Sequence, residues 1–401
     1  MTATESGTIA LIWAQYAAYH VDRCEAVAAR LGTGRLAGRH TVLAVEVAST
    51  SRYYAWEPSG DTAGATKLTL FPDQPYDQVP ALRRVLAIYR AVRRCDWVFI
   101  GLPYSGPDVI LLSLLLRLSG VRLIVFSESK ADDQPRKALT EWIKRVVLSV
   151  YHGAIVGAAR HIAYFRGLGF RQRPVLPGYN GVNIDRVRAQ AGQVLAAAGA
   201  PFAARPFVYV GRFVDKKNLP NLIDAYAAYT RAAGALARPL ILAGSGPEEA
   251  EMRARIARGG VADLVSFPGF LSAEEVSRLL SGALALVLVS REEQWGLVVN
   301  EALALGLPVI ASQQVGARDA LVRHGENGWV VDSEDISAIA AALTSAAASE
   351  AQWQAMVTAS HGRAWLGDTE RLADAVEAML CSAGSQPVGR MAEFTTAIAQ
   401  Q

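Results

Sequence analysis

The sequence predicts an α/β protein of two domains, each a doubly wound parallel sheet with helices on both faces. Short continuous runs of Val, Ile and Leu alternate with longer stretches of helical periodicity, which is the pattern of buried parallel strands joined by helices. The 401 residues exceed the size of one compact domain. A break rich in Gly, Ala and Pro at residues 178–203 separates two halves that repeat this alternation.

In the first half, five short apolar runs are predicted strands and four amphipathic stretches are predicted helices. The strands are residues 8–13, 41–47, 97–100, 123–126 and 154–156. The helices are residues 21–31, 80–93, 108–119 and 136–151. Pro80 suits the first position of its helix, because the N–H that proline lacks would have no partner there.

The second half follows the same pattern with six strands and five helices. The strands are residues 207–210, 240–243, 265–267, 285–289, 309–311 and 329–331. The helices are residues 219–232, 247–258, 273–281, 297–305 and 336–347, with one more at 371–381. We therefore place an N-terminal domain at 1–190, a second domain at 191–370, and a C-terminal helix and tail at 371–401 that is expected to pack back on the N-terminal domain.

Composition excludes several classes of protein. Hydrophobic residues make up 51% of the chain and charged residues 19%, which argues against disorder. The net charge of +3 is too weak for a nucleic-acid-binding protein, so no nucleic-acid partner is expected. Three distant cysteines without a CxxC motif, and an N-terminus unlike a signal peptide, favour a cytoplasmic protein.

The stretch 207-FVYVGRFVDKKNLPNLIDAY-226 places cations directly after a predicted strand. Arg212, Lys216 and Lys217 follow within seven residues, and Asp215 is the one acid among them. Ligands of open parallel sheets bind beyond the carboxyl ends of the strands, so Arg212 and Lys217 are expected to face a ligand site in the cleft between the domains. The alternative is an ordinary solvated loop.

The stretch 285-ALVLVSREEQWGLVVNEALALGLPVIAS-312 offers a second cluster. Glu293 lies on a loop before a predicted helix and Glu301 lies inside that helix. Between them, the first-turn amides of Gly296, Leu297 and Val298 have no partner within the helix and form an anion site at its positive end. A nucleotide sugar needs such amides for phosphate and carboxylates for hydroxyl groups, although two glutamates at this spacing alone are typical of an ordinary surface.

These stretches resemble the family 4 glycosyltransferases, which are retaining enzymes of the GT-B fold, with two Rossmann-like domains facing a central cleft. Gly211-Arg212 with Lys217 resembles the phosphate clamp of that family, and 293-EQWGLVVNE-301 is similar to its E-x7-E motif, with Trp295 where Phe is more usual. The segments 243-AGSGPEE-249, 266-SFPGFLSAEEV-276 and 306-GLPVIA-311 fit in order and spacing. The resemblance covers residues 207–332.

The resemblance implies roles for these residues. Arg212 and Lys217 would bind the donor diphosphate, Glu293 would hold hydroxyl groups of the donor sugar, and Glu301 would hold the ribose. The remaining donor-binding positions that it implies are Gly211, Gly244, Phe270, Leu271, Gly296, Leu297 and Val298. Because the sequence contains no DxD motif, we expect neither a metal ion nor a cofactor, with side-chain cations and a helix N-terminus stabilising the leaving group instead.

The N-terminal domain departs from the family pattern at the residues expected to bind the acceptor. Ala17-Ala18 replace the glycine pair common in the family, and Tyr19-His20 follow. His20 is a candidate acid–base or phosphate-binding group, or else a histidine at a helix end without chemistry. The cluster of Glu128, Lys130 and Asp132 is similar to a bacterial polysaccharide-type subset of the family and suits a sugar pocket, or else forms a self-satisfied salt-bridged loop.

Residues 136–151 combine an apolar stripe with basic residues. Such a helix can lie on an anionic membrane surface, which would bring the enzyme to a lipid-linked acceptor at the inner face of the membrane. The stripe is also typical of the core face of a helix.

The sequence thus favours a retaining hexosyltransferase in bacterial envelope or extracellular polysaccharide synthesis. Its donor is expected to be a nucleoside-diphosphate sugar, with uridine rather than guanosine, and its acceptor a glycan or a lipid-linked glycan. A sugar-nucleotide epimerase, a phosphorylase, and a transferase acting on a small natural product remain alternatives.

Overall fold

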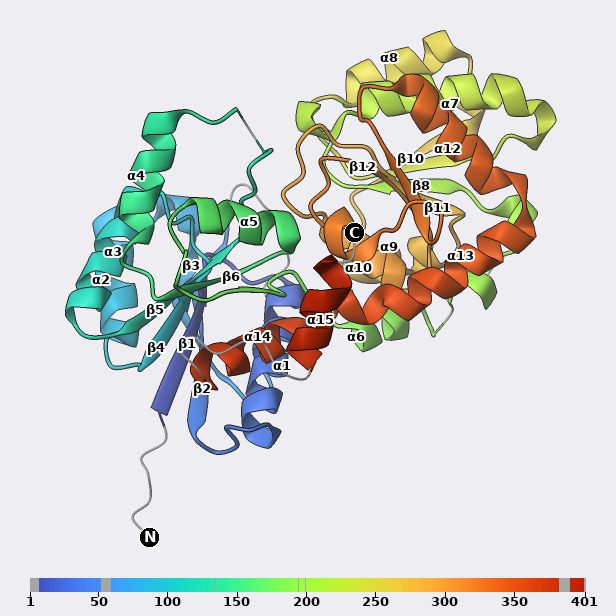
Figure 1. Ribbon diagram of the computed structural model, residues 1–401. Coiled ribbons are helices and arrows are strands. Elements are labelled where there is room, and N and C mark those ends of the chain that lie inside the picture. Colours follow the sequence, from blue (N-terminus) through green and yellow to red (C-terminus); the bar gives the residue numbers. More distant parts are fainter. Residues whose placement is uncertain are drawn as a thin grey trace. The chain divides into compact units, whose positions relative to one another are not determined.

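The computed structural model describes residues 7–51, 59–133, 135–193, 195–198, 200–381 and 390–399. These residues form two compact units. The first contains residues up to 131, then 135–183 and 369–399, and the second contains 184–368 together with residues 132 and 133. Each unit has one parallel sheet between layers of helices (Figure 1), so the predicted α/β class with two doubly wound sheets is confirmed.

The sheet of the first unit has seven parallel strands in the order β3-β2-β1-β4-β5-β6-β7. Their bounds are β1 Gly7–Trp13, β2 His40–Thr50, β3 Thr66–Pro75, β4 Trp97–Ile100, β5 Arg122–Ser127, β6 Gly153–Val156 and β7 Val175–Pro177. The central strand β1 pairs with β2 on one side and with β4 on the other. The strand order therefore reverses between β1 and β4.

Helices cover both faces of this sheet. They are α1 Ala18–Thr33, α2 Ala81–Val92, α3 Pro107–Leu118, α4 Ala138–Leu148, α5 Ala159–Gly167, α14 Glu370–Cys381 and α15 Arg390–Ala399. Helices α2 and α3 bury Val85, Ile88, Val109 and Leu112 in the same hydrophobic core as the strand residues around Val98. In contrast, α4 buries only Leu148.

The sheet of the second unit has six parallel strands in the order β10-β9-β8-β11-β12-β13. They are β8 Phe207–Val210, β9 Leu240–Ala243, β10 Val265–Gly269, β11 Ala285–Leu288, β12 Val309–Ser312 and β13 Gly328–Val331. The helices are α6 Ile184–Gln190, α7 Leu219–Ala233, α8 Glu249–Gly259, α9 Ala273–Ser281, α10 Leu297–Ala304, α11 Arg318–Leu321, α12 Ile336–Ala348 and α13 Glu350–Arg363. The order again reverses at the centre, between β8 and β11.

Two helices set the boundaries between the units. The second unit begins at Ile184, not at residue 191, because α6 packs against α9 and α10, and Ser277 Oγ donates a hydrogen bond to Gln190 Oε1 at 3.3 Å. Helix α14 packs against α1 in the first unit, where Arg30 forms ion pairs with the carboxylates of Glu370 and Asp374.

The elements that the sequence did not predict are the edge strands β3 and β7 and the helices α5, α6, α11, α13 and α15. Strand β3 alternates polar and apolar residues and contains Pro72, which an edge strand tolerates. It therefore lacks the continuous apolar run that marks a buried parallel strand.

Candidate functional site

The candidate site lies at the carboxyl edge of the second sheet, where the strand order reverses. Three loops form it: residues 211–218 after β8, 244–248 after β9 and 289–296 after β11. This is the position at which open parallel sheets bind their ligands. Most of the residues expected to bind the donor lie on these loops or at the start of α10.

Glycines allow the first two loops to pack backbone against backbone. The amide of Gly211 donates to Ala243 O at 3.0 Å, and the amide of Phe213 donates to Ser245 O at 2.9 Å. Gly244 has a φ of +136°, and a Cβ atom there would lie 1.9 Å from Gly211 O. Gly244, a predicted donor-binding residue, therefore has a structural reason to be glycine, independent of any ligand.

The loop after β8 continues into a 3-10 turn, Asp215–Lys217, that is fastened to the end of β11. Asn218 ends the turn with a φ of +57°, a conformation that asparagine tolerates better than most residues. Its buried Nδ2 donates to Val289 O at 3.1 Å and to Ser333 O at 2.6 Å. The amide of Arg291 donates to Lys216 O at 2.8 Å. These bonds fix the backbone that carries Lys217.

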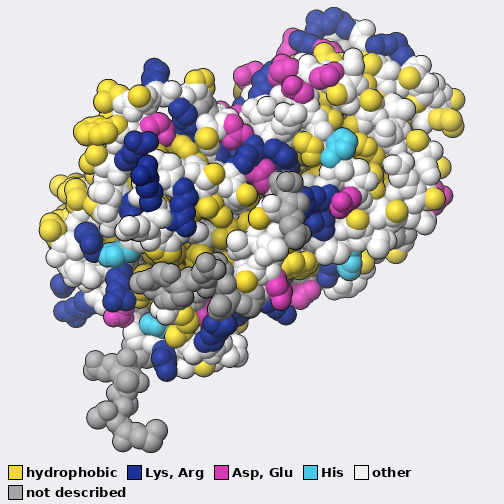
Figure 2. All heavy atoms as spheres, in the orientation of Figure 1, with side chains coloured by type: hydrophobic (Ala, Val, Ile, Leu, Met, Phe, Trp, Pro, Cys, Tyr) yellow, Lys and Arg dark blue, Asp and Glu magenta, His cyan; other side chains and the backbone are white. Residues whose placement is uncertain are grey.

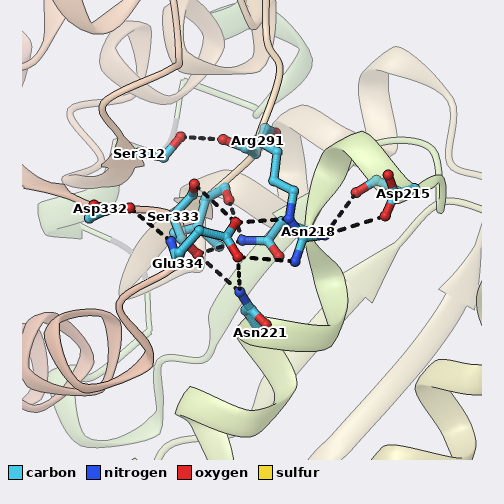
Figure 3. A network of polar contacts seen from close by, with 10 residues as sticks. Asp215, Asn218, Asn221, Arg291, Ser312, Asp332, Ser333 and Glu334 are labelled. Atoms are coloured by element: carbon cyan, nitrogen blue, oxygen red, sulfur yellow. Dashed lines mark hydrogen bonds and ion pairs between the residues drawn. The ribbon is translucent and has the colours of Figure 1, made fainter.

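Arg291 is the centre of a polar network at this edge (Figure 3). Its Nη1 donates to Asp215 Oδ1 at 3.3 Å, and its Nε donates to Glu334 Oε1 at 2.8 Å. The hydrogen bonds from Arg291 hold the pKa of Glu334 below its ordinary value. Asn221 donates from α7 to Ser333 O at 3.2 Å, so the network joins the loops after β8, β11 and β13.

Lys217 and Glu293 form an ion pair across the switch point. Lys217 Nζ donates a hydrogen bond to Glu293 Oε2, and each side chain is 13% exposed. Lys216 lies 3.7 Å from Glu292 Oε1. Asp215 is the one acid among the cations in the local sequence, but the fold brings two glutamates to the lysines from a loop more than seventy residues away.

The start of α10 presents backbone amides beside this pair. Gly296 has a φ of +97°, and no acidic residue lies in the first turn. Among the described residues, we find no hydrogen-bond partner for the amides of Leu297 and Val298. Their N–H groups, together with the positive end of the helix, can bind an anion.

Trp295 and Asn300 hold the start of α10 in place. Trp295 Nε1 donates to Asn300 Oδ1 at 2.9 Å, and Asn300 Nδ2 donates to Gly367 O at 2.9 Å. Both side chains are buried. Sequence reasoning did not find Asn300, because an asparagine in a helix gives no signal of a long-range bond.

The other residues expected to bind the donor lie beside Gly211, on α10 and directly after β10. Arg212 is exposed next to Gly211, and its carbonyl accepts a hydrogen bond from the Tyr209 hydroxyl at 2.9 Å. Glu301 is half-buried on α10, one turn beyond Gly296. Phe270 is 64% exposed directly after β10, and Leu271 beside it is half-buried.

In the first unit, His20 serves as a helix cap. Its Nδ1 accepts a hydrogen bond from the amide of Ala17 at 3.0 Å, and burial, with a smaller contribution from Arg23, lowers its pKa well below the ordinary value. Its ring lies 4.1 Å from that of Tyr19 between centroids. The same A-A-x-H pattern begins α5, where His161 Nδ1 accepts from Ala158 N at 3.2 Å.

The predicted acceptor cluster after β5 is spread over different degrees of burial. Lys130 is fully buried, Glu128 is half-buried and Asp132 is exposed. The three side chains therefore do not form one exposed cluster for an acceptor.

Comparison with a family model gives a match within the second unit, and curated proteins match part of the chain. Residues 203–362 match the family model described as glycosyl transferases group 1. The chain is 31% identical over 160 residues to the amylovoran biosynthesis glycosyltransferase AmsK of Erwinia amylovora, covering 38% of this chain and 39% of that protein. It is 33% identical over 150 residues to the putative colanic acid biosynthesis glycosyltransferase WcaL of Salmonella typhimurium, covering 36% of each.

A third relative has an inositol phosphate in its name. The D-inositol 3-phosphate glycosyltransferase of Streptomyces scabiei is 33% identical over 172 residues, covering 41% of this chain and 38% of that protein. The chain thus spans about two-fifths of the length of these relatives.

Solved structures resemble most of the chain. Sucrose-phosphate synthase from Thermosynechococcus elongatus has a TM-score of 0.69 at 21% identity, over 94% of this chain and 98% of that one. The Anabaena protein HepE, solved in complex with UDP and glucose, has a TM-score of 0.65 at 16% identity, over 94% of this chain and 100% of that one. At these identities the likeness establishes a shared fold.

Proposed function

This chain belongs to the family 4 glycosyltransferases by its group 1 domain and has the GT-B fold, and we propose from this premise that it transfers a sugar from a nucleoside-diphosphate sugar to an acceptor hydroxyl. The Lys217–Glu293 pair beside the start of α10 carries the proposal. It places a cation, a carboxylate and free amides at the switch point of one sheet. A nucleotide sugar offers phosphate to the cation and amides, and hydroxyl groups to the carboxylate.

In the proposed donor complex, Lys217 and Arg212 bind the diphosphate with the amides of Leu297 and Val298. Glu293 accepts hydrogen bonds from the donor sugar and Glu301 from the ribose. Backbone near Phe270 and Leu271 borders the base. Lys217 would then contact both Glu293 and the phosphate. Because Glu293 already binds Lys217, the Lys217 side chain would lie close to the phosphate before the donor binds.

Catalysis follows from charge stabilisation. When the bond between the anomeric carbon and the phosphate oxygen breaks, its electron pair stays on that oxygen, and Lys217, Arg212 and the α10 amides stabilise the growing negative charge. The acceptor oxygen bonds to the anomeric carbon on the same face. Because this is the face from which the phosphate leaves, the configuration is retained. The acceptor proton passes to the donor phosphate, so this route needs neither a metal ion nor a carboxylate nucleophile.

We infer UDP rather than GDP as the leaving nucleotide, and HepE, solved with UDP, supports this choice. The polysaccharide names of AmsK and WcaL support a glycan or lipid-linked acceptor. The inositol phosphate in the name of the Streptomyces relative supports a small-molecule acceptor as the second candidate.

We place the protein in the cytoplasm, with peripheral contact to the inner face of the membrane through residues 136–151. No helix among the described residues is long and apolar enough to cross a membrane.

Thermal-shift measurements with UDP, GDP, ADP and dTDP test the donor. A nucleotide at one hundred times its dissociation constant stabilises the protein by about 2.7 kcal/mol. We expect this shift with UDP, followed by sugar incorporation from UDP-sugars into an acceptor extract. Stabilisation by inorganic phosphate without any nucleotide response would instead support a phosphorylase, and interconversion of the nucleotide sugar without transfer would support an epimerase.

A further inference from the structure

Exposed hydrophobic side chains concentrate on one part of the first unit. Of the thirteen large hydrophobic side chains exposed in the described part of the chain, nine lie on α2, α3 and α4. We call this surface the three-helix face. Its apolar members are Leu82, Leu86, Leu111, Leu114, Leu118, Leu139, Trp142, Ile143 and Val146.

Helix α4 contributes most strongly to the three-helix face. Leu139 is 69% exposed and Trp142 is 59% exposed, so the expectation that this stripe is a core face is wrong for most of its residues. Leu118 at the end of α3 is 84% exposed. Figure 2 shows hydrophobic side chains beside Lys and Arg along the side of the first unit over α3 and α4. Apolar exposure on this scale usually marks an interaction surface.

The exposed charges on the three helices and on the segments that follow them are nearly all positive, whereas Asp77 and Asp132 are exposed on the loops before α2 and α4. Within residues 81–96, 107–122 and 136–149, Asp108 is paired with Arg84, and Glu141 with Lys144. Asp96 is the one exposed carboxylate in these three segments, and it accepts a hydrogen bond from the amide of Thr8 at 2.8 Å. The exposed cations of the same segments are Arg83, Arg90, Arg93, Arg94, Arg117, Arg122, Lys137 and Arg145.

We propose that the three-helix face binds the surface of an anionic lipid bilayer. Apolar side chains on an amphipathic helix enter the boundary between headgroups and acyl chains, and nearby Lys and Arg attract lipid phosphates. Eight exposed cations would repel each other across a symmetric contact between two copies of this chain, which argues against self-association. The charge pattern therefore favours the bilayer as the partner.

Binding in this way would bring the loop that precedes α4 to the membrane. Glu128 and Lys130 lie directly after β5, and α4 begins at Ala138. This consequence rests on the proposed function: a transferase held there would receive an acceptor whose lipid anchor stays in the bilayer. Bilayer binding itself does not depend on any activity and can be measured without a donor.

Flotation with sized vesicles tests the proposal on the full-length protein. We expect binding to vesicles of phosphatidylglycerol and phosphatidylcholine at low salt, and at least tenfold weaker binding to phosphatidylcholine alone or in high salt. No flotation with the anionic vesicles at low salt overturns the proposal. Equal binding to neutral vesicles also overturns it, because the charge argument then fails.

Variants locate the surface. Vesicle binding should weaken at least tenfold in the triple variant Leu139→Gln, Trp142→Gln, Ile143→Gln. It should weaken by about fivefold or more for each cation replaced in the double variant Lys137→Glu, Arg145→Glu. The matched controls are Leu236→Gln and Arg231→Glu, which change an exposed leucine and an exposed arginine of the second unit. Controls that lose binding as strongly as the test variants overturn the assignment of the face.

Two further readouts keep the test independent of folding and function. The fluorescence of Trp142 should shift to the blue on anionic vesicles, and Trp142→Phe should bind while losing most of this shift. Each variant should keep the melting temperature and the UDP affinity of the natural chain. If UDP does not bind but flotation is intact, the proposed function alone is refuted. If the natural chain forms a dimer and the triple Gln variant does not, the bilayer proposal is overturned.

Discussion

At the scale of single residues, the ion pair of Lys217 and Glu293 joins two predicted roles in one contact. The sequence suggests a phosphate ligand and a sugar ligand on separate loops. The fold places them in hydrogen-bond contact at a position where each is 13% exposed. The ion pair already orders the Lys217 side chain before a ligand binds. This order lowers the entropic cost of binding.

Substituting Lys217 tests this arrangement. Lys217→Ala should slow turnover on the order of 100-fold, because one group that stabilises the leaving diphosphate is lost. Lys216→Ala is the matched control, since Lys216 pairs with Glu292 at 3.7 Å and is 39% exposed. Steady-state kinetics and thermal melting should show a slow but folded Lys217 variant and a nearly normal Lys216 variant. Similar turnover in both variants would refute the phosphate clamp.

Asn218 is predicted to position Lys217 through its side-chain amide. Asn218→Gly keeps the left-handed backbone but leaves Val289 O and Ser333 O without their donor, so we expect a loss of about 1–3 kcal/mol in unfolding free energy. UDP affinity should fall as well. Asn218→Ala should lose about 1 kcal/mol more through backbone strain. Urea unfolding and UDP titration measure both effects, and a Gly variant as stable as the natural chain would mean that only the backbone conformation matters.

His20 is predicted to make stability depend on pH. Its pKa is lowered in the folded protein, so the unfolded chain binds the proton more readily and the folded state loses stability as pH falls below the unfolded value of about 6.5. The loss should approach about 1.4 kcal/mol per pH unit from this residue. His20→Gln can still accept from the Ala17 amide, as Gln does in a capping box, and should remove this part of the acid sensitivity. An unchanged pH dependence of unfolding in that variant would show that His20 does not contribute.

At the scale of elements, the loops after β8 and β9 depend on glycine for their close packing. Gly244→Ala should destabilise the protein by about 2–4 kcal/mol, because the new Cβ would lie 1.9 Å from Gly211 O at a φ of +136°. Gly260→Ala is the matched control, with a φ of +68° and no atom within 4 Å of the added Cβ. Chemical denaturation should give a clearly larger loss for Gly244→Ala, and equal losses would contradict the role assigned to the close approach.

The central strands could be predicted from the sequence because both of their faces are buried. Strands β4, β8 and β9 lie at their predicted bounds, since continuous apolar runs have one interpretation in an α/β chain. Strand β3 could not, because its own residues alternate between polar and apolar and so resemble a surface segment. Within the site, loop positions after β8 and β11 were predictable from strand order. The bonds from Asn218 and Arg291 were not, because both join loops that are distant in sequence.

At the scale of the whole molecule, the two sheets have the same strand order around their central strands. The two units differ in which segments of the chain form them. The second unit is one continuous segment from Ile184 to Asp368, apart from the two residues near 132. The first unit needs both ends of the chain, because α14 returns to α1 through the ion pairs of Arg30. The proposed donor site thus lies on the continuous unit, and the three-helix face lies on the unit assembled from both ends.

Hydrogen exchange on the full-length protein should separate these two surfaces. UDP should slow amide exchange in residues 211–218, 244–248 and 296–298, because the nucleotide would cover the edge of the second sheet. Anionic vesicles should slow exchange in α3 and α4 without affecting those loops, because their contact lies on the first unit. Adding both should give the sum of the two patterns. Protection of α4 by UDP alone, or of residues 211–218 by vesicles alone, would contradict the assignment of donor and membrane to separate units.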